Sequence, residues 1–367
     1  MQMYCTKCGT QNPDDVQVCR SCGAKLIPSA IQAPGLTVKS SGMAIAAFVL
    51  ALLSIFTCAL TAIPAIILGI VSLVRIEKSG GSLTGRGFAI AGIVVPIVSV
   101  FTVALLMGIL MPALARTRQL AFRMTCGTNL SGIGKAMIIY SNDYEDELPR
   151  SGGENCTWSK NIPNWKADNR FAAYGIKDDG TGGRASISSC FYLLVKYAEV
   201  TPKSFICKGD TGATEFRPYQ EGAGSAEFIK LWDFGPEPSK HCSYSYHMPF
   251  GQYKLTTSSE PGMAVAADRN PLQDSPSAAA KMWPAIYDPD AGREAQKYGN
   301  AITHQEEGQN VLFLDCHVAF EKRPNCGINE DNIYTFWDGG DIRVGAPPTV
   351  GSKPPHRLDS LLVHDPP

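Results

Sequence analysis

The sequence predicts a multidomain fold: a small four-cysteine module, a helical transmembrane region, and a long helix that leads into an α+β head with an antiparallel sheet. Three observations predict it. Two Cys-x-x-Cys pairs stand near the N-terminus, apolar residues crowd positions 43–115, and glycine, proline, serine, aspartate and asparagine crowd the remainder. The 367 residues carry a formal net charge of -1, so the charge balance indicates no nucleic-acid partner.

The first element, residues 1–27, contains the pairs Cys5-x-x-Cys8 and Cys19-x-x-Cys22, and a glycine follows each pair. Thiolates two residues apart can bind one metal ion, and the glycine permits a tight turn, so the four cysteines predict a structural zinc ribbon. So short a segment buries too little core to fold unaided, and we expect zinc to supply the folding free energy. The alternatives are two disulfides or a redox-active pair.

The next elements are a linker and a membrane domain. Residues 28–41 are rich in proline, glycine, serine and threonine, which predicts a flexible linker. The membrane domain, 42–115, begins with the uncharged stretch 42–74, which is too long for one upright span and tight for two. Because Pro64 divides this stretch, one tilted, kinked helix or a re-entrant hairpin is expected. The polar loop 75–87 follows.

The second uncharged stretch, 88–115, is expected to be a membrane-spanning helix. Its twenty-eight residues would span about 42 Å against ~30 Å of hydrocarbon, so the helix can cross a bilayer and project beyond it. The chain passes without a turn signal into a polar helical stretch, and we expect the helix to continue over 116–146 and to end before Pro149.

The head follows this helix, and the whole of 116–346 forms the predicted stem and α+β head. Helical patterning covers 188–200, and strand patterning occurs at 243–248, 263–267 and 310–320. The proline-rich segment 347–367 is expected to be a frayed tail.

Several segments of the stem and head keep the order found in one bacterial family. They include Met111-Pro-Ala-Leu-Ala-Arg-Thr-Arg118, Leu148-Pro149, Thr201-Pro-Lys-Ser-Phe-Ile-Cys207 and Gly308-Gln-Asn-Val-Leu-Phe-Leu-Asp-Cys-His-Val318. In these segments the chain resembles type IV pilin-like proteins and the general-secretion pseudopilins of type II secretion. The resemblance implies a non-enzymatic, membrane-anchored component of a secretion or envelope apparatus, with protein partners from a secretion or pilus-like system.

Two departures from the pilin pattern bear on processing. A prepilin carries a short leader and a glutamate just after the cleavage point, whereas here eighty-seven residues precede Phe88, and Ala91 and Gly92 stand near the place of the glutamate. We therefore expect neither cleavage before Phe88 nor polymerisation. The apolar pieces also resemble a small bacterial membrane domain of unknown function that is often fused to other modules: Gly42 to Ala46, Ile63 to Leu73 and Gly85 to Gly92.

Two cues disagree about the side of the membrane on which the head lies. Basic residues flank every apolar stretch, so the positive-inside rule leans weakly towards both termini inside. The pilin resemblance instead implies a head outside the bacterial inner membrane. We choose a re-entrant hairpin over 42–74, a cytoplasmic zinc ribbon that binds a protein partner, and an extracytoplasmic head reached through 88–115. The alternative function is a signalling or regulatory adaptor that uses the ribbon to bind a cytoplasmic partner.

The head contains a second candidate metal site and no catalytic motif. Asp315 and His317 stand two apart after an apolar strand, and with Asp268 and His304 they could hold a divalent ion. Calcium is the ion that the pseudopilin resemblance implies. Residues at strand ends also hydrogen-bond turns, which is the alternative interpretation. No phosphate-binding loop, nucleophile elbow or metalloprotease helix occurs, so no catalytic residues are assigned; an enzyme acting on envelope glycans ranks third.

The cysteines beyond the membrane domain number seven: Cys126, Cys156, Cys190, Cys207, Cys242, Cys316 and Cys326. In an oxidising compartment an odd number leaves at least one free or paired between chains. In the cytoplasm they would be buried thiols.

Overall fold

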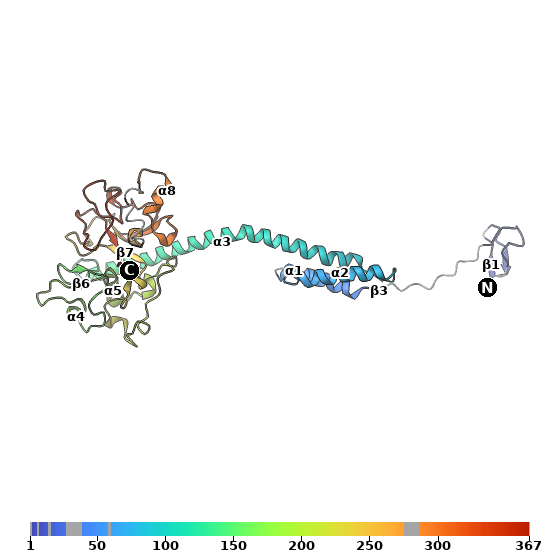
Figure 1. Ribbon diagram of the computed structural model, residues 1–367, viewed down its shortest axis with the longest axis horizontal. Coiled ribbons are helices and arrows are strands. Elements are labelled where there is room, and N and C mark those ends of the chain that lie inside the picture. The colour runs from blue at the N-terminus through green and yellow to red at the C-terminus, as the bar shows by residue number, and fades with distance from the viewer. Residues whose placement is uncertain are drawn as a thin grey trace. The chain divides into compact units, whose positions relative to one another are not determined.

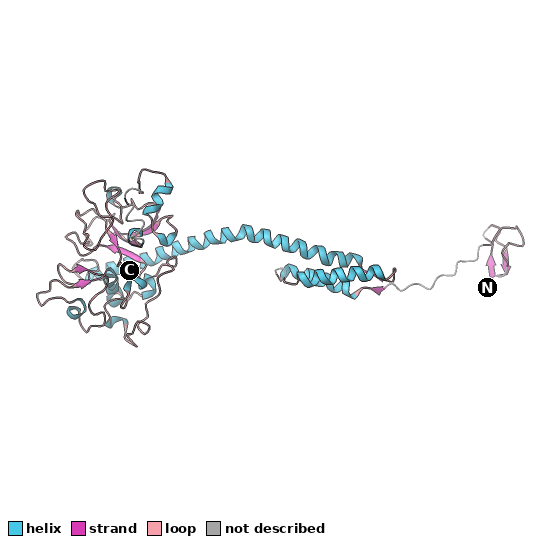
Figure 2. Ribbon diagram, in the orientation of Figure 1, coloured by secondary structure: helices cyan, strands magenta, loops and turns pink. Residues whose placement is uncertain are grey.

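A computed structural model describes residues 2–5, 7–13, 16–26, 39–57, 60–274, 283 and 287–366. The chain divides into two compact units, Met1–Ala113 and Leu114–Pro367, which are described one after the other. Figure 1 colours the elements along the chain, and Figure 2 distinguishes helices from strands. Most of the predicted linker 28–41 lies outside the described residues.

The first unit begins with the cysteine module. Strand β1 (Gln2–Tyr4) pairs antiparallel with β2 (Gln11–Pro13), and a single bridge joins Val18 to Lys25. Its buried apolar residues are few, namely Cys5, Cys19 and Leu26. So small a cluster is consistent with a module held together chiefly by its cysteines.

The membrane domain contains two short helices before the long one. Helix α1 (Gly42–Phe56) ends before a turn residue at Thr57, and helix α2 (Ala62–Lys78) begins after turn residues at Leu60 and Thr61, so 42–74 contains two helices and not one kinked helix. Pro64 lies in the first turn of α2, where a backbone N–H has no partner within the helix and proline is tolerated. The two-residue strands β3 (Lys39–Ser40) and β4 (Leu83–Thr84) pair in parallel.

Small residues line the contacts between α1, α2 and the first part of α3 (Arg86–Asp143). A Cβ atom on Gly69 would lie 2.7 Å from Ile93 Cγ1, and one on Gly92 would lie 2.9 Å from Ala47 Cβ. Five alanines of these helices are fully buried: Ala44, Ala47, Ala51, Ala65 and Ala89. Large apolar side chains are exposed instead, among them Ile45, Val49, Ile67, Ile70, Ile90 and Val94. Small residues inside and large apolar residues outside are typical of helices packed in lipid.

Enlarging a glycine at these contacts tests the packing. In a variant with Ser54→Cys and Ser99→Cys, whose native hydroxyls lie 3.4 Å apart, we expect efficient oxidative cross-linking in membranes. Gly92→Leu should slow that cross-linking severalfold, because overpacking costs about 1–3 kcal/mol. Trypsin cleavage in the loop 75–87, followed by non-reducing electrophoresis, measures the linked fraction. Gly108→Leu is the control, since open space surrounds Gly108, and equal rates for the two variants would contradict the packing.

The second unit contains a five-stranded antiparallel sheet, in the order β10-β9-β8-β7-β11. The strands are β7 (Tyr244–His247), β8 (Ala264–Asp268), β9 (Gln309–Phe313), β10 (Val318–Glu321) and β11 (Leu362–Val363). The predicted antiparallel sheet of an α+β head is therefore confirmed. The predicted strand segment 310–320 divides into a hairpin, β9 and β10, that turns at Asp315 and Cys316.

The C-terminal part of α3 packs directly on this sheet. A Cβ atom on Gly134 would lie 2.7 Å from Leu312 Cδ1, so the helix backbone approaches β9 closely. The buried residues of this part recur every three or four positions: Cys126, Leu130, Ile133, Met137 and Tyr140. The spacing places them on one helix face, which joins the main core of the head.

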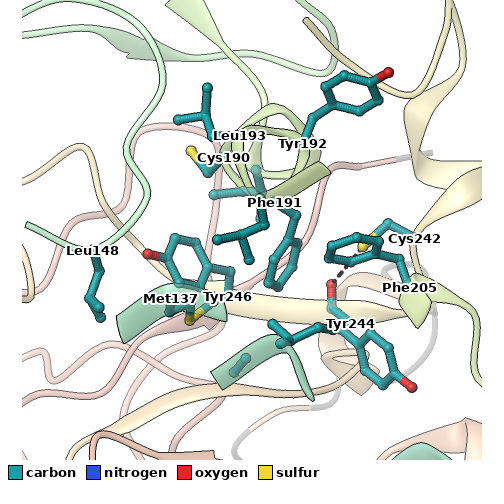
Figure 3. Close-up of a cluster of buried hydrophobic side chains, with 14 of the residues drawn as sticks. Met137, Leu148, Cys190, Phe191, Tyr192, Leu193, Phe205, Cys242, Tyr244 and Tyr246 are labelled. Atoms are coloured by element: carbon teal, nitrogen blue, oxygen red, sulfur yellow. Dashed lines mark hydrogen bonds between the residues drawn. The ribbon is translucent and has the colours of Figure 1, made fainter. Parts of the chain in front are cut away.

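Helix α5 (Ile187–Tyr197) is the centre of that core. Every residue from Ile187 to Val195 is buried, and Phe191 packs at a tilt against Phe205 and Tyr246, with ring centroids 5.4 and 5.1 Å apart (Figure 3). Ser186 caps the helix in a reciprocal pair with Ser189.

Residues 347–367 do not form the frayed tail that the sequence predicts. Leu361 to Val363 are fully buried, and β11 pairs with β7 as an edge strand of the sheet. Farther on, the carboxylate of Asp365 accepts hydrogen bonds from the N–H groups of Ile187 and Ser188 at the start of α5. The high proline content of this segment predicted a frayed tail, whereas the short apolar run Leu361 to Val363 is buried and contains strand β11.

The remaining elements of the head are short. The described strands are β5 (Thr157–Trp158) and β6 (Arg184–Ala185), which pair in parallel, and the described α-helices are α4 (Arg170–Tyr174), α6 (Pro271–Asp274) and α8 (Arg293–Gln296). The 3₁₀ turns are Pro202–Phe205, Phe228–Lys230, Pro238–His241, Lys297–Gly299, Ile302–His304 and Ile328–Glu330.

Buried carboxyl groups make the stability of the head depend on pH. Burial raises the pKa of Asp233 to about 8, that of Asp331 to about 8 and that of Asp359 to about 7. A raised folded-state pKa favours folding at low pH, and this contribution is lost as the pH rises towards the folded-state value. Above pH 6.5 the opposing effect of buried His247, whose pKa burial lowers to about 4, has vanished.

We therefore expect the free energy of unfolding of the head to fall by about 1–3 kcal/mol from pH 6.5 to pH 8. Tryptophan fluorescence during denaturant unfolding of the full chain measures it, because all five tryptophans lie in the head. Asp359→Asn should flatten the dependence, while Asp315→Asn, at an exposed carboxylate, should leave it unchanged. A profile that rises with pH over this window would contradict the assignment.

Candidate metal centre

The cysteine module is built from two turns of the same geometry. In each turn the glycine after the second cysteine donates its N–H to the carbonyl of the first: Gly9 to Cys5 at 2.8 Å and Gly23 to Cys19 at 2.9 Å. Both glycines adopt positive φ, +71° and +69°, which other residues rarely adopt. The glycines that the sequence places after each pair therefore close the turns that bring the thiols together.

The four sulfur atoms form one cluster. Cys5 Sγ lies 3.6 Å from Cys22 Sγ, Cys8 Sγ lies 3.6 Å from Cys19 Sγ, and all four atoms lie within 4.8 Å of one another. Four thiolates bound about 2.3 Å from a central zinc ion would be ~3.8 Å apart. The residues therefore fit a tetrahedral zinc ion, and the thiols are free, unlike in the alternative of two disulfides.

The surroundings of the cluster favour a thiolate at Cys19 and a closed site. Backbone N–H groups of Cys22 and Ser21 lower the pKa of Cys19 to about 6. Asn12 is buried, donates from Nδ2 to Cys19 Sγ at 3.5 Å, and accepts at Oδ1 from the N–H of Arg20 at 3.0 Å. Sequence reasoning missed Asn12, because a single asparagine between two cysteine pairs carries no distinguishing signal. Four protein ligands leave no coordination position open, so the zinc is structural.

Comparisons with known proteins agree with the first unit of the chain. Residues 4–26 match the family described as a zinc-ribbon domain, and residues 43–107 match a domain of unknown function, DUF4190. No curated protein and no solved structure matches the chain. Among the described residues, α3 is the one helix long and apolar enough to cross a membrane. The chain is therefore a membrane protein with a zinc-binding module.

Neither family match reaches the stem and head. The matches end at residue 107, so the comparisons give no support to the predicted pilin-like or pseudopilin-like identity.

The second predicted metal site does not form as four residues. Asp268 and His304 are buried together, with Asp268 Oδ2 3.1 Å from His304 Nε2. Asp315 and His317 form a separate exposed pair in the turn of the β9–β10 hairpin. Because β8 and β9 run antiparallel, Asp268 lies beside Asn310 at one end of the pair, whereas Asp315 follows the other end of β9. The sequence placed Asp315 and His317 at the end of an apolar strand and Asp268 after another, but it did not show which strand ends meet.

The buried pair has neighbours that the sequence did not indicate. Asn310 donates its backbone N–H to Asp268 Oδ2 at 2.7 Å, and its Nδ2 lies 3.1 Å from the same oxygen. Cys207 Sγ lies 3.7 Å from His304 Nε2, and Cys207 is disulfide-bonded to Cys126 of α3. Eighty-one positions separate the two cysteines, so no local spacing signals this bond.

Removing one ligand tests the zinc ribbon. We expect Cys19→Ser to abolish zinc binding at the module, and Asn12→Ala to weaken zinc binding roughly 10- to 100-fold, as is typical for outer-shell partners of a metal ligand. Competition with a chromophoric chelator measures both. Gln11→Ala, at an exposed neighbour, is the matched control. Equal zinc affinity in the Asn12→Ala and Gln11→Ala variants would refute the role of Asn12.

Proposed function

We propose that the protein is a non-enzymatic, membrane-anchored structural or interaction component of a bacterial secretion or envelope apparatus of the pilin-like kind. The observation that carries this proposal is the continuity of α3, Arg86–Asp143. Its uncharged first part is suited to lipid, and its last part supplies one face of the core of the head. A single helix that is both anchor and core supports a role in holding the head at a membrane.

The contrast between the two sets of cysteines supports placing the ribbon in the cytoplasm and the head outside. The ribbon thiols are free and clustered, as a reducing compartment favours. The Cys126–Cys207 disulfide in the head suits an oxidising compartment, although the other five head cysteines are free thiols. Helices α1 and α2, about 22 and 25 Å long, are each shorter than the ~30 Å hydrocarbon layer, which favours a re-entrant hairpin.

The packing of the membrane domain supports an uncut chain. A cut before Phe88 would separate α1 and α2 from the helix on which they pack, since Ala47 of α1 touches Gly92 of α3. It would also remove the covalent connection between Phe48 and Phe88, whose rings make an edge-to-face contact with centroids 5.4 Å apart. We propose that the protein acts uncut, with the ribbon available to a cytoplasmic protein partner while the head faces the envelope.

Labelling with a membrane-impermeant maleimide tests the topology. In spheroplasts we expect Tyr219→Cys, at an exposed position of the head, to react at once, because the head faces outward. Ser82→Cys, in the polar loop, should react only after permeabilisation. The wild-type chain is the control for reaction of native cysteines. A Tyr219→Cys variant that reacts only after permeabilisation would overturn the envelope role and favour the cytoplasmic adaptor.

A further inference from the structure

Four metal-ligating side chains from distant segments meet inside the head. They are Cys126 of α3, Cys207 after the first 3₁₀ turn, Asp268 at the end of β8, and His304 in the turn Ile302–His304. All four residues are buried, and one potential ligand atom from each lies within 4.8 Å of the others. Such a convergence of two sulfurs, one imidazole and one carboxylate is a donor set typical of zinc sites.

One polar atom of this cluster lacks a partner. Asp268 Oδ2 is occupied by Asn310 and His304, whereas Asp268 Oδ1 is buried and has no hydrogen-bond partner among the described residues. A buried carboxylate oxygen without a partner is costly and calls for a ligand. On the sulfur side, the N–H of Gly209 points at Cys207 Sγ from 3.4 Å, a contact that would favour a thiolate.

We propose that this cluster is a second zinc site that forms when the Cys126–Cys207 disulfide is reduced. Its ligands are the two thiolates, an imidazole nitrogen of His304 and a carboxylate oxygen of Asp268. Around a tetrahedral zinc ion, neighbouring ligand atoms lie about 3.3–3.8 Å apart. The contact of 3.7 Å between Cys207 Sγ and His304 Nε2 is already close to this spacing. The Asp268 carboxylate lies beside this pair, with Oδ2 3.1 Å from His304 Nε2 and Oδ1 without a partner in the described part of the chain. Asn310 Nδ2 also lies 3.2 Å from His304 Nε2, and zinc binding at this nitrogen would replace that contact.

Replacement of the Cys126–Cys207 disulfide by zinc requires a reductant. Reduction by a phosphine and water adds two electrons and two protons to the disulfide, gives two thiols, and leaves the phosphine as its oxide. Zinc then replaces the two thiol protons, which pass to solvent. The disulfide joins α3 to Cys207 alone, whereas zinc also joins α3 to β8 and to the turn Ile302–His304. The stem helix is thus fastened to the head in either redox state.

Zinc stoichiometry in the purified full chain tests the proposal. We expect one zinc per chain, in the ribbon, before reduction, and two after treatment with a water-soluble phosphine, addition of zinc and removal of the free ion. His304→Ala and Asp268→Asn should each return the reduced protein to one zinc. His317→Ala, which removes the exposed histidine at the other end of the sheet, should retain two. Elemental analysis by mass spectrometry counts the metal.

A second measurement covers variants that fail to fold. In the reduced, zinc-loaded wild type, Cys126 and Cys207 should resist alkylation, and peptide mass spectrometry reads each site; protection should be lost on chelation. Tryptophan fluorescence identifies the variants that fold. If His304→Ala does not fold, Asp268→Asn is used in its place, because the asparagine keeps an acceptor for Asn310. A reduced wild type with one zinc and alkylated Cys126 and Cys207 would overturn the proposal, as would two zinc ions in folded His304→Ala or Asp268→Asn.

Discussion

The structure depends on one constraint: a single helix, α3, must be stable in lipid over its first half and in an aqueous, folded head over its second half. Its N-terminal half exposes large apolar side chains such as Phe101, Leu105 and Leu110, which only lipid or another apolar surface can cover. Its C-terminal half buries one face, with Leu130, Ile133 and Met137 inside, and exposes a mixture of charged, polar and apolar side chains on the rest of its surface. Hydrogen bonds within the helix satisfy the backbone in both environments, so the side-chain pattern alone changes along the element.

The same change in solvent explains why the two units are built differently. In lipid, apolar side chains gain little by leaving their surroundings, so α1 and α2 pack on the first part of α3 through close contacts at Gly92 and Gly69 and through small alanines. In water, burial of apolar area drives folding, and the head therefore gathers aromatic rings around α5 (Figure 3). The zinc ribbon has neither close helix packing nor a large buried apolar core, and its four thiolates, by binding a metal ion, would supply the folding free energy instead.

Features set by local spacing could be predicted from the sequence, and those set by distant pairing could not. The ribbon cysteines and the strands β7 and β8 follow from patterns within a few residues. The break between α1 and α2 falls at Thr57 instead of Pro64, because proline fits the first turn of a helix. The disulfide of Cys126 with Cys207 and the burial of β11 depend on segments brought together only by the folded sheet. Asp268 and Asp315 lie apart for the same reason, because the antiparallel pairing of β8 and β9 places the end of β8 beside the start of β9.

Sulfur chemistry then distinguishes the two ends of the chain. In the ribbon, two similar turns, each closed by a glycine N–H that donates to a cysteine carbonyl, bring the sulfurs together, and few buried apolar residues stabilise the fold. In the head, Cys126 and Cys207 lie within an extensive core that does not need a metal to form. A covalent bond between these two cysteines therefore adds a fixed attachment between α3 and the segment that follows the first 3₁₀ turn. The disulfide thus restrains α3 against the head in addition to the apolar packing of Leu130, Ile133 and Met137.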